Sequence, residues 1–101
     1  MAETQNVLPV GDWLIGAILT TSVIIGTTPT ALPATALANR RFLDIQNVSG
    51  VTIYIGNIDV TVANGYPVAN GTSYPIDLDA GVIMYGIEAA GSREVRVLEA
   101  S

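Results

Sequence analysis

The feature of this sequence that most constrains its fold is a series of short segments in which apolar and polar residues alternate. In one of them, Leu43 and Ile45 alternate with Asp44 and Gln46, which is the period of a half-buried strand. The same period of two recurs in the segments 51–56, 58–62 and 93–99. No stretch has the period of an amphipathic helix, and turn residues recur every few positions. We therefore predict an all-β fold, a small antiparallel β-sandwich or barrel of about six to eight short strands.

Turn signals divide the predicted strands. Asn64-Gly65 and Asn70-Gly71 are strong short hairpin signals, because both residue types tolerate positive φ. The sequence around them nearly repeats itself, with Tyr66-Pro67-Val68 echoed by Tyr74-Pro75-Ile76. Proline cannot donate to a sheet ladder, so both copies are expected at strand starts or sheet edges. The apolar segment 82–90 is expected to be a longer, central strand.

The N-terminal third has a different composition. No residue from Trp13 to Asn39 is charged, and Pro29 and Pro33 favour an extended chain over residues 27–38. We predict an extended arm over residues 1–38, carrying one strand near 21–28, and a β-sandwich body over 39–101. Whether residues 12–19 form a short helix or a strand stays open at this stage.

The charge pattern argues for protein contacts. Half of the residues are hydrophobic and 13% are charged, so a small domain of this kind is expected to bury further surface between subunits. Nine acidic residues stand against four arginines, and the formal net charge is −5. Nucleic acid is therefore not an expected partner. The pairs Arg40, Arg41 and Arg93, Arg96 are expected to meet carboxylates on neighbouring strands or subunits.

The sequence shows no expected signal peptide or membrane span and has no residues for cysteine or histidine chemistry. The chain has no cysteine and no histidine, so disulfides, thiolate nucleophiles and the usual general base are excluded. Acidic Glu3 and Asp12 stand where a secretory signal carries positive charge. The apolar segment 13–25 is interrupted by polar residues and is shorter than the roughly 20 residues that a bilayer needs, so no membrane span is expected.

The residues that could support catalysis or metal binding form no recognisable set. The segment Asp77–Gly81, DLDAG, resembles the start of a calcium loop but lacks the further acidic ligands, and is interpreted as a solvated turn. Four carboxylates could in principle supply an acid/base pair, but their spacing selects no pair among them: Asp59, Asp77, Asp79 and Glu88. No serine has a histidine to activate it. We predict no enzyme activity, no metal and no cofactor.

The tyrosines allow a second interpretation. Aromatic rings stack on the apolar faces of sugars, so these side chains are candidate glycan contacts, with cross-strand packing as the alternative: Tyr54, Tyr66, Tyr74 and Tyr85. Asn47 and Asn70 match the N-glycosylation pattern, which is too common to carry weight here.

The stretch from Arg40 to Glu99 resembles small structural proteins of tailed bacteriophages. The resemblance lies in Arg40–Asn47, Tyr54–Gly56, Gly65–Pro67, Gly71–Ser73 and Arg96–Glu99. Proteins of that kind are head decoration or cement proteins, head-fibre bases or minor virion components. The resemblance implies a place on a virion, which is assembled in the host cytoplasm, and leaves the arm uncovered.

The sequence therefore predicts a capsid decoration or cement protein that stabilises a phage head by subunit contacts. We expect a homo-oligomer, a trimer by preference, bound to the major capsid protein or another virion protein. The predicted interface residues of the arm are Trp13, Leu14, Ile15, Ile18, Leu32 and Leu37. A glycan- or receptor-binding fibre module, and a head–tail connector or tail component, are the alternatives.

Overall fold

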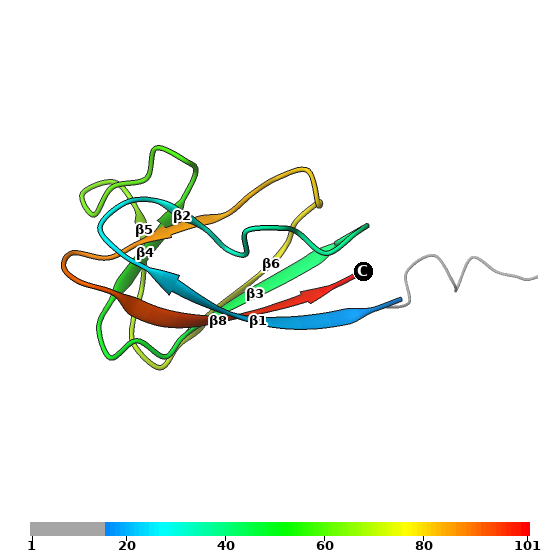
Figure 1. Ribbon diagram of the computed structural model, residues 1–101, viewed down its shortest axis with the longest axis horizontal. Coiled ribbons are helices and arrows are strands. Elements are labelled where there is room, and N and C mark those ends of the chain that lie inside the picture. Colours follow the sequence, from blue (N-terminus) through cyan, green and yellow to red (C-terminus); the bar gives the residue numbers. More distant parts are fainter. Residues whose placement is uncertain (1–15) are drawn as a thin grey trace, which may run out of the picture.

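The computed structural model describes residues 16–101, which form two antiparallel sheets of four strands each (Figure 1). The strands are β1 (Ile18–Ile25), β2 (Thr30–Ala31), β3 (Phe42–Asn47), β4 (Ile53–Gly56), β5 (Tyr66–Val68), β6 (Ser73–Asp77), β7 (Tyr85–Ile87) and β8 (Arg93–Ala100). The described residues contain no helix. The predicted all-β class is confirmed, with the strands arranged as a sandwich.

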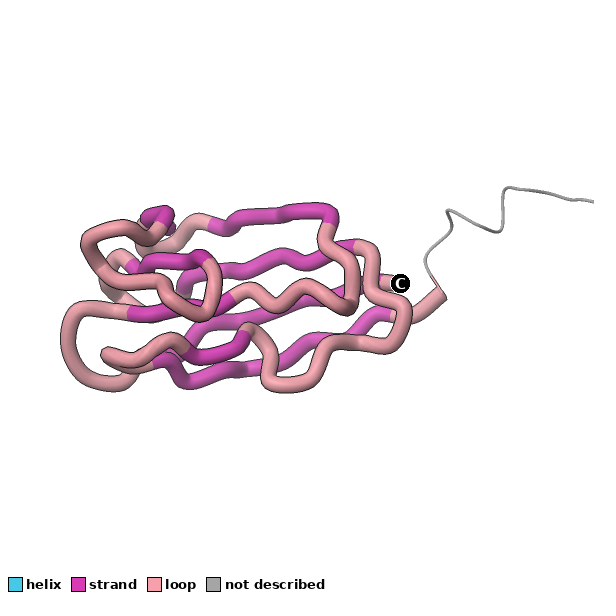
Figure 2. The backbone as a smooth tube through the Cα atoms, turned by 90° about the horizontal axis from the view of Figure 1, so that it is seen from above, coloured by secondary structure: helices cyan, strands magenta, loops and turns pink. Residues whose placement is uncertain are grey.

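The strand order is β1-β8-β3-β6 in the first sheet and β2-β7-β4-β5 in the second. β1 pairs with β8 over its whole length, from Ile18 opposite Ala100 to Ile25 opposite Arg93. Figure 2 shows the longer strands running side by side along the molecule. The four strands at sheet edges are thus β1 and β6 in the first sheet, and β2 and β5 in the second.

The core lies between the sheets and follows the alternation seen in the sequence. Leu43 and Ile45 of β3 are fully buried, and Asp44 and Gln46 face outward. The second sheet contributes Ile53 in the same way. Burying one such side chain stabilises the fold by about 1.5–3 kcal/mol. The period of two in these strands is therefore confirmed.

The N-terminal arm differs from the prediction in its described part. β1 and β2 both lie within residues 1–38 and belong to the sandwich, one in each sheet. Leu32 is fully buried, and its amide donates to the Met84 carbonyl at 2.8 Å. An uncharged extended segment satisfies its backbone by pairing with a sheet as readily as by lying on a partner. The body of the fold therefore reaches back at least to Gly16.

The alternating segment 58–62 is a loop, not the strand that its pattern predicts. Val60 is buried, whereas Ile58 is 61% exposed. Asn64 Oδ1 accepts a hydrogen bond from the Thr61 amide at 2.7 Å. Local bonds of this kind compete with strand pairing for the same backbone groups, so the segment folds on itself between β4 and β5.

One strand prediction and one turn prediction need correction. The apolar segment 82–90 holds only the three-residue strand β7, which does lie inside its sheet, between β2 and β4. Asn70-Gly71 is a turn with φ of +82° at Gly71, but it joins β5 of one sheet to β6 of the other and so makes no hairpin. The expectation for the prolines is confirmed, since Pro67 and Pro75 lie in the edge strands β5 and β6.

Candidate functional site

The most accessible apolar feature of the described residues is the edge strand β1. Ile18 is 65% exposed and Ile24 is 60% exposed, and both lie on the outer face of the first sheet. Leu19, on the inner side of the same strand, is also exposed. The strand has the sequence ILTTSVII and carries neither a charge nor a proline. A long apolar edge of this kind is a template for pairing with another chain.

Within residues 16–101, a regular set of backbone groups of β1 along this edge has no partner strand. The Ser101 amide donates to the Ala17 carbonyl at 3.0 Å, which marks Ala17 as a residue bonded toward β8. Bonded and non-bonded positions alternate along an antiparallel pair. Thr21 and the other odd-numbered residues of β1 therefore bond to β8. The amide and carbonyl groups of Ile18, Thr20, Ser22 and Ile24 point to the open edge.

The other three edges of the described sandwich are shorter or blocked. β2 has two residues and β5 has three, one of which is Pro67. β6 has five residues with Pro75 at its centre. Short strands and prolines are the usual means by which proteins protect sheet edges. Within the described residues, β1 is the edge left without such protection.

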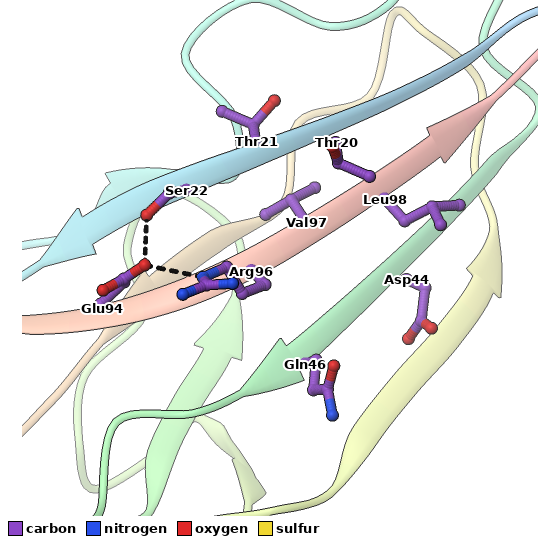
Figure 3. Close-up of a pocket in the computed structure, with 9 residues that line it drawn as sticks. All are labelled: Thr20, Thr21, Ser22, Asp44, Gln46, Glu94, Arg96, Val97 and Leu98. Carbon is purple, nitrogen blue, oxygen red and sulfur yellow. Dashed lines mark hydrogen bonds and ion pairs between the residues drawn. The ribbon is translucent and has the colours of Figure 1, made fainter.

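A shallow polar hollow of about 490 Å³ adjoins this edge on the outer face of the first sheet (Figure 3). Ser22 Oγ donates to Glu94 Oε2 at 2.6 Å, and Arg96 Nε donates to the same oxygen at 2.7 Å. These bonds lower the pKa of Glu94 below its ordinary value of 4.5, and the bond from Ser22 is the larger cause. The charges beside β1 therefore neutralise each other.

β3 supplies the other wall of the hollow. Figure 3 shows Asp44 and Gln46 on neighbouring outward positions of that strand. Asp44 Oδ1 is buried and accepts no hydrogen bond from the described residues. The hollow offers acceptors and donors for polar contacts. It holds no histidine or cysteine, so a nucleophile with an activating base is not assembled there.

A buried ion pair closes one end of the sandwich. Arg40 Nη1 lies 2.8 Å from Glu99 Oε2, and both side chains are fully buried. Arg40 Nη2 also donates to the carbonyls of Asp79 and Val82. The Leu37 amide donates to Glu99 Oε2 at 3.1 Å. The guanidinium thus joins β8, the segment before β3 and the turn after β6.

The polar groups of the turn at residues 77–81 bond within the chain. Its backbone carbonyls are turned toward the Arg40 guanidinium, and Asp79 Oδ2 accepts from the Gly81 amide at 3.0 Å. Within residues 16–101 no three acidic, histidine or cysteine side chains gather as a metal site. The expectation that arginines meet carboxylates on neighbouring strands is confirmed for Arg40, which pairs with Glu99 of β8. Arg96 pairs instead with Glu94 of its own strand. Which carboxylates they meet was not readable from the sequence.

The four tyrosines lie in two different regions of the fold. Tyr66 of β5 and Tyr74 of β6 meet with ring centroids 5.1 Å apart and planes tilted by 55°. This pair bridges the two sheets at the edge opposite β1 and β2. Tyr66 is 58% exposed, whereas Tyr74 packs against the core. Tyr54 and Tyr85 lie on β4 and β7 of the second sheet and are half-buried.

The two glycosylation patterns have different surroundings. Asn47 is fully buried, and its side-chain amide donates to the carbonyls of Val51 and Val68 at 2.7 and 2.8 Å. Its Oδ1 accepts from the Ser49 amide and hydroxyl. The Asn47 side chain thus links β3 to β5 by hydrogen bonds inside the fold. The sequence pattern did not reveal this role. Asn70 is exposed, and its Oδ1 accepts from the Gly50 amide.

The predicted interface residues separate when placed on the fold. Ile18 lies on the open edge, Leu37 is half-buried, and Leu32 belongs to the core and is not available to a partner. Trp13, Leu14 and Ile15 lie outside the described residues. Sequence reasoning missed Ile24 and Leu19, although the absence of charge in ILTTSVII was the signal that could have found them.

The four carboxylates considered for acid/base work lie on different elements. Asp59 is in the loop after β4, Asp77 ends β6, and Asp79 follows in the next turn. All three are exposed. Glu88 is buried just after β7, where its amide donates to the Gly26 carbonyl.

Comparison of the chain with known protein families and with curated proteins finds no match. Among residues 16–101 there is no helix of the length and apolar character that crossing a membrane requires.

Proposed function

We propose that this chain is a virion structural protein, a capsid decoration or cement protein that stabilises a phage head by contacts between subunits. The observation that carries the proposal is the uncharged, unprotected edge of β1, with Ile18 and Ile24 exposed on it. An edge of this kind is a template for pairing with the backbone of another chain. The partners would be further copies of the chain and the major capsid protein, on a particle assembled in the host cytoplasm.

The resemblance to small phage structural proteins supports the same function. It covers residues 40–99, which hold β3 to β8, and its shared segments lie in strands and in the turns between them. Such a rigid two-layer body suits a protein that is repeated over a shell, because each copy presents the same surfaces. The low content of charge also favours contacts that bury apolar area, at about 25 cal/mol per Å² before association costs.

The test is addition of the purified full chain to phage shells that lack it. We expect saturable co-sedimentation of the chain with the shells and a rise in the melting temperature of the shells. Replacing Ile18 and Ile24 by serine is expected to reduce both effects, and the matched control replaces exposed Ile58 and Val82 by serine. Absence of binding by the folded wild-type chain would overturn the proposal.

Electron microscopy of labelled particles distinguishes the proposed place from its alternative. Label spread over the head supports a decoration or cement protein. Label confined to one vertex or to the tail supports a connector or tail component, which would use the same contacts at a different position.

A glycan-binding fibre module is the second candidate, and the Tyr66 and Tyr74 pair favours it. Two rings 5.1 Å apart, one of them 58% exposed, offer a small aromatic surface. Stacking on a sugar requires such a surface. Screening on a glycan array tests this function, and binding that is lost in Tyr66→Ala and kept in Tyr54→Ala would establish it.

A further inference from the structure

We propose that β1 pairs with β1 of a second copy of this chain, antiparallel and about a two-fold axis through Thr21. The two first sheets would then join into one continuous sheet across the axis. This inference concerns the contact between copies and does not depend on a place in a virion. It replaces the trimer expected from the sequence by a two-fold pair.

The first argument is the chemical symmetry of the strand. Read outward from Thr21, polar Thr20 is matched by polar Ser22, and the next two positions on each side are apolar. Antiparallel pairing centred on Thr21 therefore sets Ile18 of one copy against Ile24 of the other, and Leu19 against Val23. The exposed apolar side chains of β1 would cover one another, as cross-strand pairs do.

The second argument comes from the backbone. Even-numbered residues of β1 carry the free amide and carbonyl groups, as the Ser101 bond to Ala17 indicates. In the register centred on Thr21, even residues face even residues, so Thr20 meets Ser22 of the second copy with both sets of groups aligned. The pair would form up to about eight hydrogen bonds between chains. Side chains also keep their faces, with outward residues against outward ones.

The third argument is electrostatic. Two copies of a chain with a net charge of −5 repel each other over most of their surfaces. β1 lies in a stretch without charge, and the charged side chains on the outer face of β8, Glu94 and Arg96, form an ion pair at 2.7 Å. The edge of β1 is thus a place where two copies meet without bringing like charges together, which favours a second copy as the occupant.

The register can be measured because the natural chain has no cysteine. Thr21 would face its own counterpart at a non-hydrogen-bonded position, with Cα atoms about 4.5 Å apart, within the range of a disulfide. Thr20 would lie diagonal to its counterpart, at about 7–8 Å, beyond that range. We therefore compare Thr20→Cys, Thr21→Cys and Ser22→Cys in the full chain under mild oxidation.

Fastest formation of a disulfide-linked pair by Thr21→Cys supports the proposal. Fastest linkage by Thr20→Cys or Ser22→Cys means a shifted register and overturns it, as does linkage by none of the three. Circular dichroism of the reduced variants ensures that each is folded.

Light scattering of the wild-type chain provides the second measurement. We expect the mass of two chains, falling to that of one chain in Thr20→Pro, which removes a donor from the free edge. The matched control Ser73→Pro changes an outward residue of the other edge of the same sheet and is expected to keep the mass of two. A wild-type mass of one or three chains overturns the proposal, as does a mass of two that Thr20→Pro leaves unchanged while its circular dichroism stays native.

Discussion

The two edges of the first sheet are built in opposite ways. β1 has eight residues, no proline and two exposed isoleucines, whereas β6 has five residues with Pro75 at the centre. The Asn47 amide donates to the Thr72 carbonyl, so the backbone groups of even-numbered residues of β6 point toward β3. The backbone groups of odd-numbered residues, Pro75 among them, point to the free edge. One edge lacks a donor at its centre, and the other keeps its donors and acceptors.

The difference shows that each edge strand is open to or protected from pairing by its own length and its own prolines. The side of the sandwich that holds β5 and β6 has a proline in each strand and an aromatic bridge between Tyr66 and Tyr74. The side that holds β1 has only the short β2 beside it in the second sheet. Two edges of one sheet therefore differ in how far they are protected against pairing with another chain.

The largest expected effect is on the buried ion pair of Arg40 and Glu99, which stabilises the sheet that has both edges. Arg40→Met leaves Glu99 buried without its ion pair, and we expect a loss of about 3–5 kcal/mol in the free energy of unfolding, measured in urea. The control is Arg41→Met at the next, exposed position, with a change within about 0.5 kcal/mol. Equal losses of unfolding free energy in the two variants would mean that the buried ion pair does not stabilise the fold.

The next effect asks whether β1 bonds to β8 as the alternation indicates. Thr21→Pro removes an amide that bonds to β8 and leaves a β8 carbonyl unpaired, so we expect a loss of about 2–3 kcal/mol. Thr20→Pro removes an amide that points to the free edge and should cost the isolated chain clearly less. Urea unfolding at low protein concentration measures both. The reverse order would show that the free groups of β1 lie on odd residues.

A smaller effect is expected at the aromatic bridge. Tyr66→Ala removes the ring that meets Tyr74 and should lower the free energy of unfolding by about 1 kcal/mol, because half of the Tyr66 side chain is already exposed. Tyr66→Phe keeps the ring and is expected to match the wild type. A loss in Tyr66→Phe as large as that in Tyr66→Ala would assign the effect to the hydroxyl instead.

Restoring a donor to the protected edge should change association more than stability. Pro75→Thr places an amide at the centre of β6, and we expect a stability change within about 0.5 kcal/mol together with new, concentration-dependent growth in light scattering. Ser73→Thr on the same strand adds no donor and serves as the control. Pro75→Thr protein that scatters as the wild type would show that proline is not what protects this edge.

The smallest effect is the pH dependence beside β1. The bonds from Ser22 and Arg96 lower the pKa of Glu94 in the folded chain below 4.5, so Glu94 contributes stability above that pH and loses it as the pH falls through the folded pKa. Ser22→Ala removes the larger cause and should raise the pKa of Glu94 in an NMR titration. An unchanged pKa in Ser22→Ala would contradict the assigned cause.

Much of the sandwich was readable from local pattern. Alternation at Leu43 and Ile45 gave a strand with the correct inward face, and the prolines marked edge strands. The same alternation failed at 58–62, because asparagine side chains satisfy the backbone there. The candidate site was predicted least well, since the partner groups of an edge strand are known only when the sheet order is known.

The sequence by itself determined that this chain forms strands, which faces of them are buried, and that β1 carries no charge. These properties depend on residues one or two positions apart. Only the tertiary structure decided that ILTTSVII is an edge strand, that Leu32 lies in the core and that Arg40 meets Glu99. Those outcomes join residues that are distant in the chain, through backbone bonds and buried contacts that no local pattern encodes.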